Sequence, residues 1–235
     1  MIQWIKGHTL IVLLIIAAVF TFDWLIQCRK QLRIKWYAAL LLTILHVAYG
    51  VMSVKLFALA EAGFNAEKAG NLSLFGAIFL MPLAYYLGAK LFRRSVPTVF
   101  DVFTIPLVLT LFCARINCTI TGCCLGKIIP GTQMRWPTRE AELLFYAVFL
   151  AFVISRSLKG CGKGRIYPLF MVAYGAFRAV IECFRENDAY PGLFHLSHLW
   201  AFITLALGII CLCLQKRNSG AAAAGNRSAA KQNRR

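Results

Sequence analysis

Residues 9–26, TLIVLLIIAAVFTFDWLI, form an apolar stretch long enough to cross a bilayer as a helix, because such a span needs roughly 20 mainly apolar residues. The sequence contains six more apolar runs, at about 36–58, 72–92, 98–114, 141–156, 166–183 and 195–214. These runs are longer than the alternating strands of a membrane barrel. With 60% hydrophobic and 15% charged residues, the chain is too apolar for a water-soluble domain. We therefore predict an all-α polytopic integral membrane protein with about seven transmembrane helices.

The first apolar run could instead be a cleaved signal peptide. It is long, however, and contains Asp23 and Trp24. The segment Cys28-Arg29-Lys30 follows it, where a small-residue cleavage site would be needed. We therefore expect the run to remain in the protein as a helix.

Lysine and arginine gather in alternate connections between the apolar runs, and basic connections favour the cytoplasmic side. The basic residues after the first, third and fifth runs and in the tail include Arg29, Lys30, Arg33, Lys35, Lys90, Arg93, Arg94, Arg156, Lys159, Lys163, Arg165, Lys216 and Arg217. This distribution predicts an N-terminus outside and a C-terminus in the cytoplasm. The connection between the fourth and fifth runs is an exception, because Arg115, Lys127, Arg135 and Arg139 fall on its outer side. Positive charge is disfavoured in connections on the outer side, so its presence in this connection suggests a function.

The chain divides into a transmembrane helical domain, residues 1–217, and a basic cytoplasmic tail, residues 218–235. Scattered Arg and Lys around Ala221–Ala224 predict that the tail is disordered. The formal net charge of +17 is explained by loops that contact anionic lipid. No nucleic-acid partner is expected, because the sequence contains no folded basic domain.

Charged residues inside membrane helices are costly and are functional candidates. They are Asp23, Lys55, Asp101, Glu142, Arg178 and Glu182. In the run 166–183 and just beyond it, Tyr174, Arg178, Glu182 and Arg185 are spaced by four, four and three residues, which places them on one helical face. Arg178 and Glu182 can pair there. The pair is either a structural ion pair or part of a site.

The segment 114–127, ARINCTITGCCLGK, begins at the outer end of the fourth run. Arg115 would therefore lie near Arg178, and two guanidiniums that face one cavity suit a phosphate group. Gly122 and Gly126 would let the backbone approach a ligand closely. At this depth in a membrane, the abundant phosphate belongs to a phospholipid headgroup.

Cys118, Cys123 and Cys124 in this segment admit more than one interpretation. Together with His195 and His198 they could bind a metal, although structural zinc sites usually use spaced pairs. A disulfide is the favoured interpretation, although the adjacent Cys123 and Cys124 are unsuited to bond each other. A thiol–disulfide exchange function would favour a C-x-x-C motif, which this sequence lacks.

The sequence resembles the bacterial prolipoprotein diacylglyceryl transferase family over roughly its second half. Residues 101–106 (DVFTIP) resemble the D-x-x-x-P entry into a helix, with one extra residue here. Residues 115–126 (RINCTITGCCLG) resemble the variant signature R-x-x-C-x-x-x-G-C-C-x-G. Residues 135–142 (RWPTREAE) resemble R-H-P-[ST]-Q-x-Y-E, and residues 174–185 (YGAFRAVIECFR) resemble Y-G-x-F-R-x-x-x-E-F-x-R.

The chain also departs from the family pattern. Phe75 stands where the family has a histidine. Cys118 stands where the signature has its first asparagine, and Cys123 where it has its glutamate. Members of the family act on a cysteine thiol of their protein substrate. Because of these departures, the residue that would deprotonate this thiol here is unassigned.

The resemblance implies a multi-pass enzyme of the bacterial plasma (inner) membrane that acts in lipoprotein biosynthesis. It would transfer diacylglyceryl from phosphatidylglycerol to the lipobox cysteine of prolipoprotein signal peptides. Arg115, Arg178 and Glu182 would be catalytic, and Tyr174, Gly122, Gly126 and Arg185 would bind substrate. No metal and no organic cofactor is implied. The alternative is a non-catalytic or repurposed relative that binds phospholipid or lipopeptide in the membrane.

Overall fold

The computed structural model describes residues 2–65, 72–158, 164–186 and 196–232, and its regular elements are helices. In chain order they are α1 (Ile2–Gln27), α2 (Arg29–Leu32), α3 (Trp36–Glu61), α4 (Phe75–Leu91), α5 (Val96–Thr121), α6 (Thr138–Leu158), α7 (Ile166–Glu182) and α8 (Leu196–Gln232). Each of the seven apolar runs coincides with one long helix, so the all-α class is confirmed. The short helix α2 was not expected from the sequence.

Four of these helices are long and apolar enough to cross a membrane. Their candidate spans are His8–Gln27, Trp36–Glu61, Val96–Thr121 and Leu196–Arg217. The helix Phe75–Leu91 is apolar but shorter. Helices α6 and α7 do not meet these criteria within the described residues. The chain thus has the character of a polytopic membrane protein.

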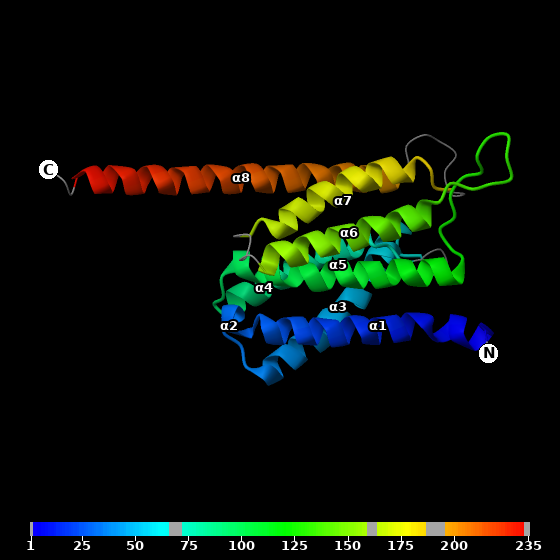
Figure 1. Ribbon diagram of the computed structural model, residues 1–235, viewed down its shortest axis with the longest axis horizontal. Helices are drawn as coiled ribbons and strands as arrows, with labels where there is room; N and C mark the ends of the chain where they lie inside the picture. The colour runs from blue at the N-terminus through cyan, green and yellow to red at the C-terminus, as the bar shows by residue number, and fades with distance from the viewer. Residues whose placement is uncertain (1, 66–71, 159–163, 187–195, 233–235) are drawn as a thin grey trace.

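Helix α8 continues beyond the point where the sequence predicted a disordered tail. It runs from Leu196 to Gln232, so residues 218–232 are helical. In Figure 1, α8 projects well past the ends of the other helices. The run Ala221–Ala224 supplies a physical reason, because alanine has the highest helix propensity.

Helix α5 is the central helix of the bundle. It contacts α1, α4, α6 and α7, and most of its side chains between Val99 and Leu111 are buried. Helix α8 packs along α7, where Gly175 and Gly208 permit close approach. A Cβ atom added to Gly175 would lie 2.6 Å from the backbone nitrogen of Leu205.

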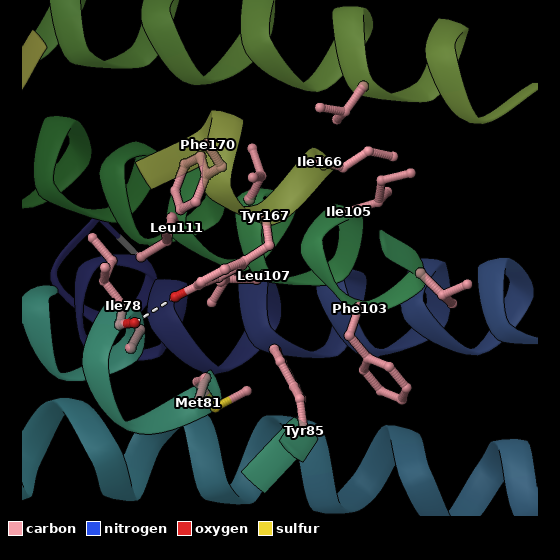
Figure 2. Close-up of a cluster of buried hydrophobic side chains, with 14 of the residues drawn as sticks. Ile78, Met81, Tyr85, Phe103, Ile105, Leu107, Leu111, Ile166, Tyr167 and Phe170 are labelled. Atoms are coloured by element: carbon pink, nitrogen blue, oxygen red, sulfur yellow. Dashed lines mark hydrogen bonds between the residues drawn. The ribbon is translucent and has the colours of Figure 1, made fainter. Parts of the chain in front are cut away.

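A cluster of buried hydrophobic side chains joins α4, α5 and α7 (Figure 2). Its largest members include Met81, Tyr85, Phe103 and Phe170. The hydroxyl of Tyr167 reaches across it and donates a hydrogen bond to the carbonyl oxygen of Ile78. The same cluster also includes side chains of α1, α3, α6 and α8, so it is the common core of the bundle.

Asp101, one of the charged residues expected inside the membrane, has a structural role. Its carboxylate is buried and accepts hydrogen bonds from the backbone N–H groups of Gly164, at 2.7 Å, and Ile166, at 3.1 Å. These bonds satisfy N–H groups at the start of α7, which a helix cannot pair internally. Asp101 therefore fixes the beginning of α7 against α5.

The two ends of the bundle carry different connections (Figure 1). The N-terminus lies at the same end as the loop that joins α5 to α6, and α8 leads the chain to the opposite end. Residues 126–135 of this loop form two isolated antiparallel bridges, Gly126 with Arg185 and Ile128 with Arg135. This loop end is where the charged residues of α5, α6 and α7 gather.

Candidate functional site

Three helices bring a network of buried charges together. Arg115 of α5 pairs with Glu142 of α6 at 2.8 Å. The other oxygen of the same carboxylate binds Arg178 of α7. Arg178 also pairs with Glu182, one turn later on α7, at 2.9 Å. The pairing expected from the i,i+4 spacing of Arg178 and Glu182 is therefore present, and Glu142 bridges the two arginines.

Arg185 extends the network beyond the end of α7. Its guanidinium lies 3.5 Å from the carboxylate of Glu182. The side chains of Arg115, Glu142, Arg178 and Glu182 are at most 7% exposed, and that of Arg185 is 12% exposed. Three guanidiniums and two carboxylates give these five residues a net charge of +1, and Glu61 of α3 acts electrostatically on Arg178 from outside the set. Burial of an uncompensated charge is expensive, so the network favours an additional anion.

Several polar groups of the network are free to bind such an anion. The Nε atoms of Arg115, Arg178 and Arg185 are buried and have no hydrogen-bond partner among the described residues. The hydroxyl of Tyr174, which is 1% exposed, has none either in this part of the chain. Unpaired buried donors cost about 1–3 kcal/mol each. A ligand with several acceptor oxygens would recover this cost.

Phe75 forms an apolar wall beside the network. The guanidinium carbon of Arg178 lies 5.7 Å from the centre of its ring, and the ring packs edge-on against Tyr174 at 5.9 Å. Phe75 thus lies beside the polar residues, at the position where the resemblance placed a histidine. A phenyl ring can attract the cation but cannot accept a proton.

The loop after α5 is held against the residues that follow α7. The backbone N–H of Lys127 donates to the carbonyl of Phe184 at 2.8 Å, and that of Glu186 donates to Leu125 at 3.1 Å. Arg135 pairs with Glu186. These contacts join the Cys123-Cys124 segment to the end of α7, next to the buried network.

The two candidate glycines belong to this loop. Gly122 has φ +79° and ends α5, a left-handed conformation that suits glycine. A Cβ on Gly126 would lie 2.1 Å from the carbonyl oxygen of Trp136. Gly126 therefore permits a close approach of backbone to backbone within the loop.

Three thiols gather at the same place. The Sγ atoms of Cys118, Cys123 and Cys124 lie within 4.8 Å of one another, and all three are free thiols in the structure. A hydrogen bond with the Cys118 thiol, together with Arg185 and Arg115 nearby, lowers the pKa of the Cys124 thiol. His195 lies outside the described residues. His198 contacts Cys183 instead, at 3.6 Å.

The structure places most of the sequence-predicted residues together. Arg115, Tyr174, Arg178, Glu182 and Arg185 form one cluster, and Gly122 and Gly126 lie in the adjoining loop. The sequence analysis noted Glu142 only as an intramembrane charge, whereas Glu142 is the residue that joins α5 to α7. Its acidic side chain in an apolar run was a signal, but its partners lie 27 and 36 residues away in the sequence.

The other charged candidates are elsewhere. Asp23 accepts a hydrogen bond from the side chain of Gln27 at 2.7 Å on an exposed face. Lys55 is exposed on α3. Within the described part of the chain, the ion pairs of the buried network join α5, α6 and α7 and include neither of these residues.

An apolar helical bundle with a buried cluster of charged side chains at one end is typical of a polytopic membrane protein. The chain belongs to the prolipoprotein diacylglyceryl transferase family, whose model matches residues 10–214.

Individual relatives are similar to this chain at modest identity. A phosphatidylglycerol–prolipoprotein diacylglyceryl transferase of Idiomarina loihiensis is 32% identical over 161 residues, which are 63% of this chain and 60% of that protein. One from Clostridium tetani is 24% identical over 151 residues, 58% of this chain and 61% of the relative. One from Dehalococcoides mccartyi strain BAV1 is 21% identical over 208 residues, 78% and 79% of the two chains. The chain thus matches about three fifths of the length of the first two relatives.

Proposed function

We propose that this protein transfers diacylglyceryl from phosphatidylglycerol to the cysteine thiol of a lipobox in prolipoprotein signal peptides. The substrate sulfur attacks the glycerol carbon next to the phosphate. A carbon–sulfur bond forms as the carbon–oxygen bond breaks, and glycerol-1-phosphate leaves with the electron pair of that bond. The product is a thioether, and the thiol proton is released.

The observation that carries this proposal is the set of buried, unpartnered donors in a network whose guanidiniums outnumber its carboxylates. A phosphodiester has one negative charge and several acceptor oxygens, which suit the unpartnered Nε–H groups and the Tyr174 hydroxyl. As the carbon–oxygen bond breaks, negative charge grows on the leaving phosphate. Donors that are already in place stabilise such developing charge without reorganisation.

Each residue then has a definite role in the proposal. Arg115 and Arg178 neutralise the leaving phosphate, and Glu142 and Glu182 hold the two guanidiniums in position. The Tyr174 hydroxyl hydrogen-bonds the headgroup. Gly122, Gly126 and Arg185 contribute to the substrate-binding side of the site.

The transfer itself is the decisive test. The purified full-length protein, in vesicles that contain phosphatidylglycerol with a labelled diacylglyceryl group, is expected to label a lipobox peptide. A peptide with serine in place of the lipobox cysteine is the matched control and should stay unlabelled. If the protein binds the peptide or the lipid but transfers no label under conditions in which a relative is active, the alternative of a non-catalytic lipid-binding protein replaces the enzyme.

We also propose seven membrane spans in a bacterial inner membrane, with the N-terminus outside and the C-terminus in the cytoplasm. The alternation of basic connections supports this orientation. The position of the N-terminus and the α5–α6 loop at one end of the bundle agrees with it. The network would then lie near the outer leaflet, where it could meet phosphatidylglycerol and exported precursors.

Labelling of intact cells tests this orientation. A membrane-impermeant maleimide is expected to add label to Thr132→Cys, because residue 132 lies in the loop after α5, but not to Ser219→Cys in α8. The unsubstituted chain is the control for the native cysteines, and lysed cells should show label at both positions. If only Ser219→Cys is labelled in intact cells, the orientation is the reverse of the one proposed.

A further inference from the structure

The three clustered thiols are not used by the reaction proposed above. Cys118 lies in the last turn of α5, whereas Cys123 and Cys124 follow the turn at Gly122. The turn brings the chain back, so that the three Sγ atoms lie within 4.8 Å of one another. Cys124 adopts a positive φ of 59°, a conformation uncommon for residues other than glycine. The backbone is therefore strained where it brings the third thiol to the other two.

The arrangement suits a metal ion better than a disulfide. A disulfide would use two sulfurs and leave the third thiol beside it. Thiolates that bind zinc at about 2.3 Å in a tetrahedral site lie about 3.8 Å apart, a separation that small side-chain rotations could provide in this cluster. Zinc is bound by thiolates at neutral pH without a change of oxidation state.

The charge of the surrounding residues also favours a zinc ion bound by thiolates. Three thiolates and one zinc ion together have a charge of −1. Arg115 precedes Cys118 by three residues on α5, so the two side chains share a helical face. The cluster also lies in the loop that is bound to the residues after α7. A metal held there would adjoin the arginine network.

We propose that Cys118, Cys123 and Cys124 bind a zinc ion as three thiolates, and that the fourth position accepts the thiol of the substrate cysteine. The second part rests on the proposed diacylglyceryl transfer. Zinc sites with three protein ligands keep a fourth position for water or substrate. On binding, the substrate thiol releases its proton to water and its sulfur coordinates the ion. This sulfur then attacks the glycerol carbon, and glycerol-1-phosphate leaves with the electron pair of the broken bond.

Such a site provides thiol activation that Phe75 cannot provide. A metal-bound thiol is deprotonated at neutral pH, so the step needs no histidine at this position. Arg115, one of the residues that would hold the phosphate, lies one turn before Cys118 on α5, and Cys123 and Cys124 follow the end of this helix. The arrangement thus places nucleophile and leaving group at one site.

The test measures metal on the full-length protein under conditions that keep its thiols reduced. Stoichiometric zinc is expected in the wild-type protein, with loss to background in Cys118→Ser, Cys123→Ser and Cys124→Ser. Cys213→Ser, an exposed cysteine on α8, is the matched control and should retain the metal. Cobalt provides a second measurement that needs no variant, because cobalt added to the metal-free wild type should give a sulfur-to-metal charge-transfer band that zinc abolishes.

The outcomes separate this inference from the proposed function. Three results would overturn the metal site. The protein could bind neither zinc nor cobalt, or zinc could persist in the variant that carries all three Cys→Ser changes. The three cysteines could also contain a disulfide in protein from untreated membranes. Full transfer by metal-free protein overturns the thiol-binding part and leaves the enzyme in place. A zinc-loaded protein that transfers nothing overturns the enzyme and the thiol-binding part, and leaves the metal site.

Discussion

Arg178→Lys is expected to lower diacylglyceryl transfer by about 10²–10³-fold, or roughly 3–4 kcal/mol of barrier, the usual loss when one preorganised donor is removed. Lysine keeps the positive charge but not the planar fork of donors. In the structure that fork binds Glu142 through one nitrogen and Glu182 through the other, and its Nε remains free. The three donors of an ammonium share one nitrogen, so lysine cannot reproduce the separated contacts that the guanidinium makes with both carboxylates and a phosphate. The measurement is the transfer of labelled diacylglyceryl to a lipobox peptide, normalised to folded protein.

A control separates this loss from a defect in folding. Arg156, exposed in the last turn of α6, is replaced by lysine in the matched variant, which should keep full activity. Arg178→Lys should keep most of its folded abundance, because the charge of the network is unchanged. Full transfer by Arg178→Lys would remove this residue from the phosphate site. A loss of abundance equal to the loss of transfer would assign it a structural role alone.

Glu142→Gln is expected to destabilise the protein by about 3–5 kcal/mol, the range for removal of one partner from a buried ion pair. Glu142 is 2% exposed and binds both Arg115 and Arg178. Glutamine has a similar size but no charge, so the buried cluster would contain three guanidiniums and a single carboxylate. Thermal unfolding in detergent and protein abundance in membranes measure the effect.

Glu140→Gln is the matched control for this change. Glu140 lies two residues earlier on the same helix, and its side chain is 55% exposed with only a distant contact, 3.9 Å, to Arg139. Surface ion pairs of this kind contribute about 0–1 kcal/mol. If the two variants unfold at the same temperature, the buried network contributes little to stability. The role of Glu142 would then be confined to positioning Arg115 and Arg178 in the site.

The sequence was sufficient to predict the helices and one of the ion pairs. Long apolar runs define helices independently of their neighbours, and the four-residue spacing of Arg178 and Glu182 places them on one face of any helix. The chemical identity of the cluster also followed from Arg115, Tyr174 and Arg185. These features depend on the spacing of residues along the chain, which can be read directly from the sequence.

The remainder depends on which helices become neighbours. Glu142 binds residues on two other helices, and no spacing rule connects positions on separate helices. The α5–α6 loop is bound to residues 183–186 through backbone hydrogen bonds. Because every residue has a backbone, such contacts cannot be predicted from the types of residue in the sequence. The sequence did not indicate that α8 extends to Gln232, because small and basic residues have no apolar periodicity that marks a helix.

The placement of the charges has a consequence for how the chain enters the bilayer. Helices α6 and α7, which carry Glu142, Arg178 and Glu182, are not among the four candidate spans of the described chain. Alone in lipid, each would place charged side chains near the outer end of its span, where a charge without a partner is costly. In the proposed seven-span arrangement Arg178 and Glu182 pair within α7, whereas Arg115 and Glu142 find their partners only when α5, α6 and α7 are in contact. We therefore expect these three segments to leave the translocation machinery as an assembled group, so that the chemistry of the site also sets the order of membrane integration.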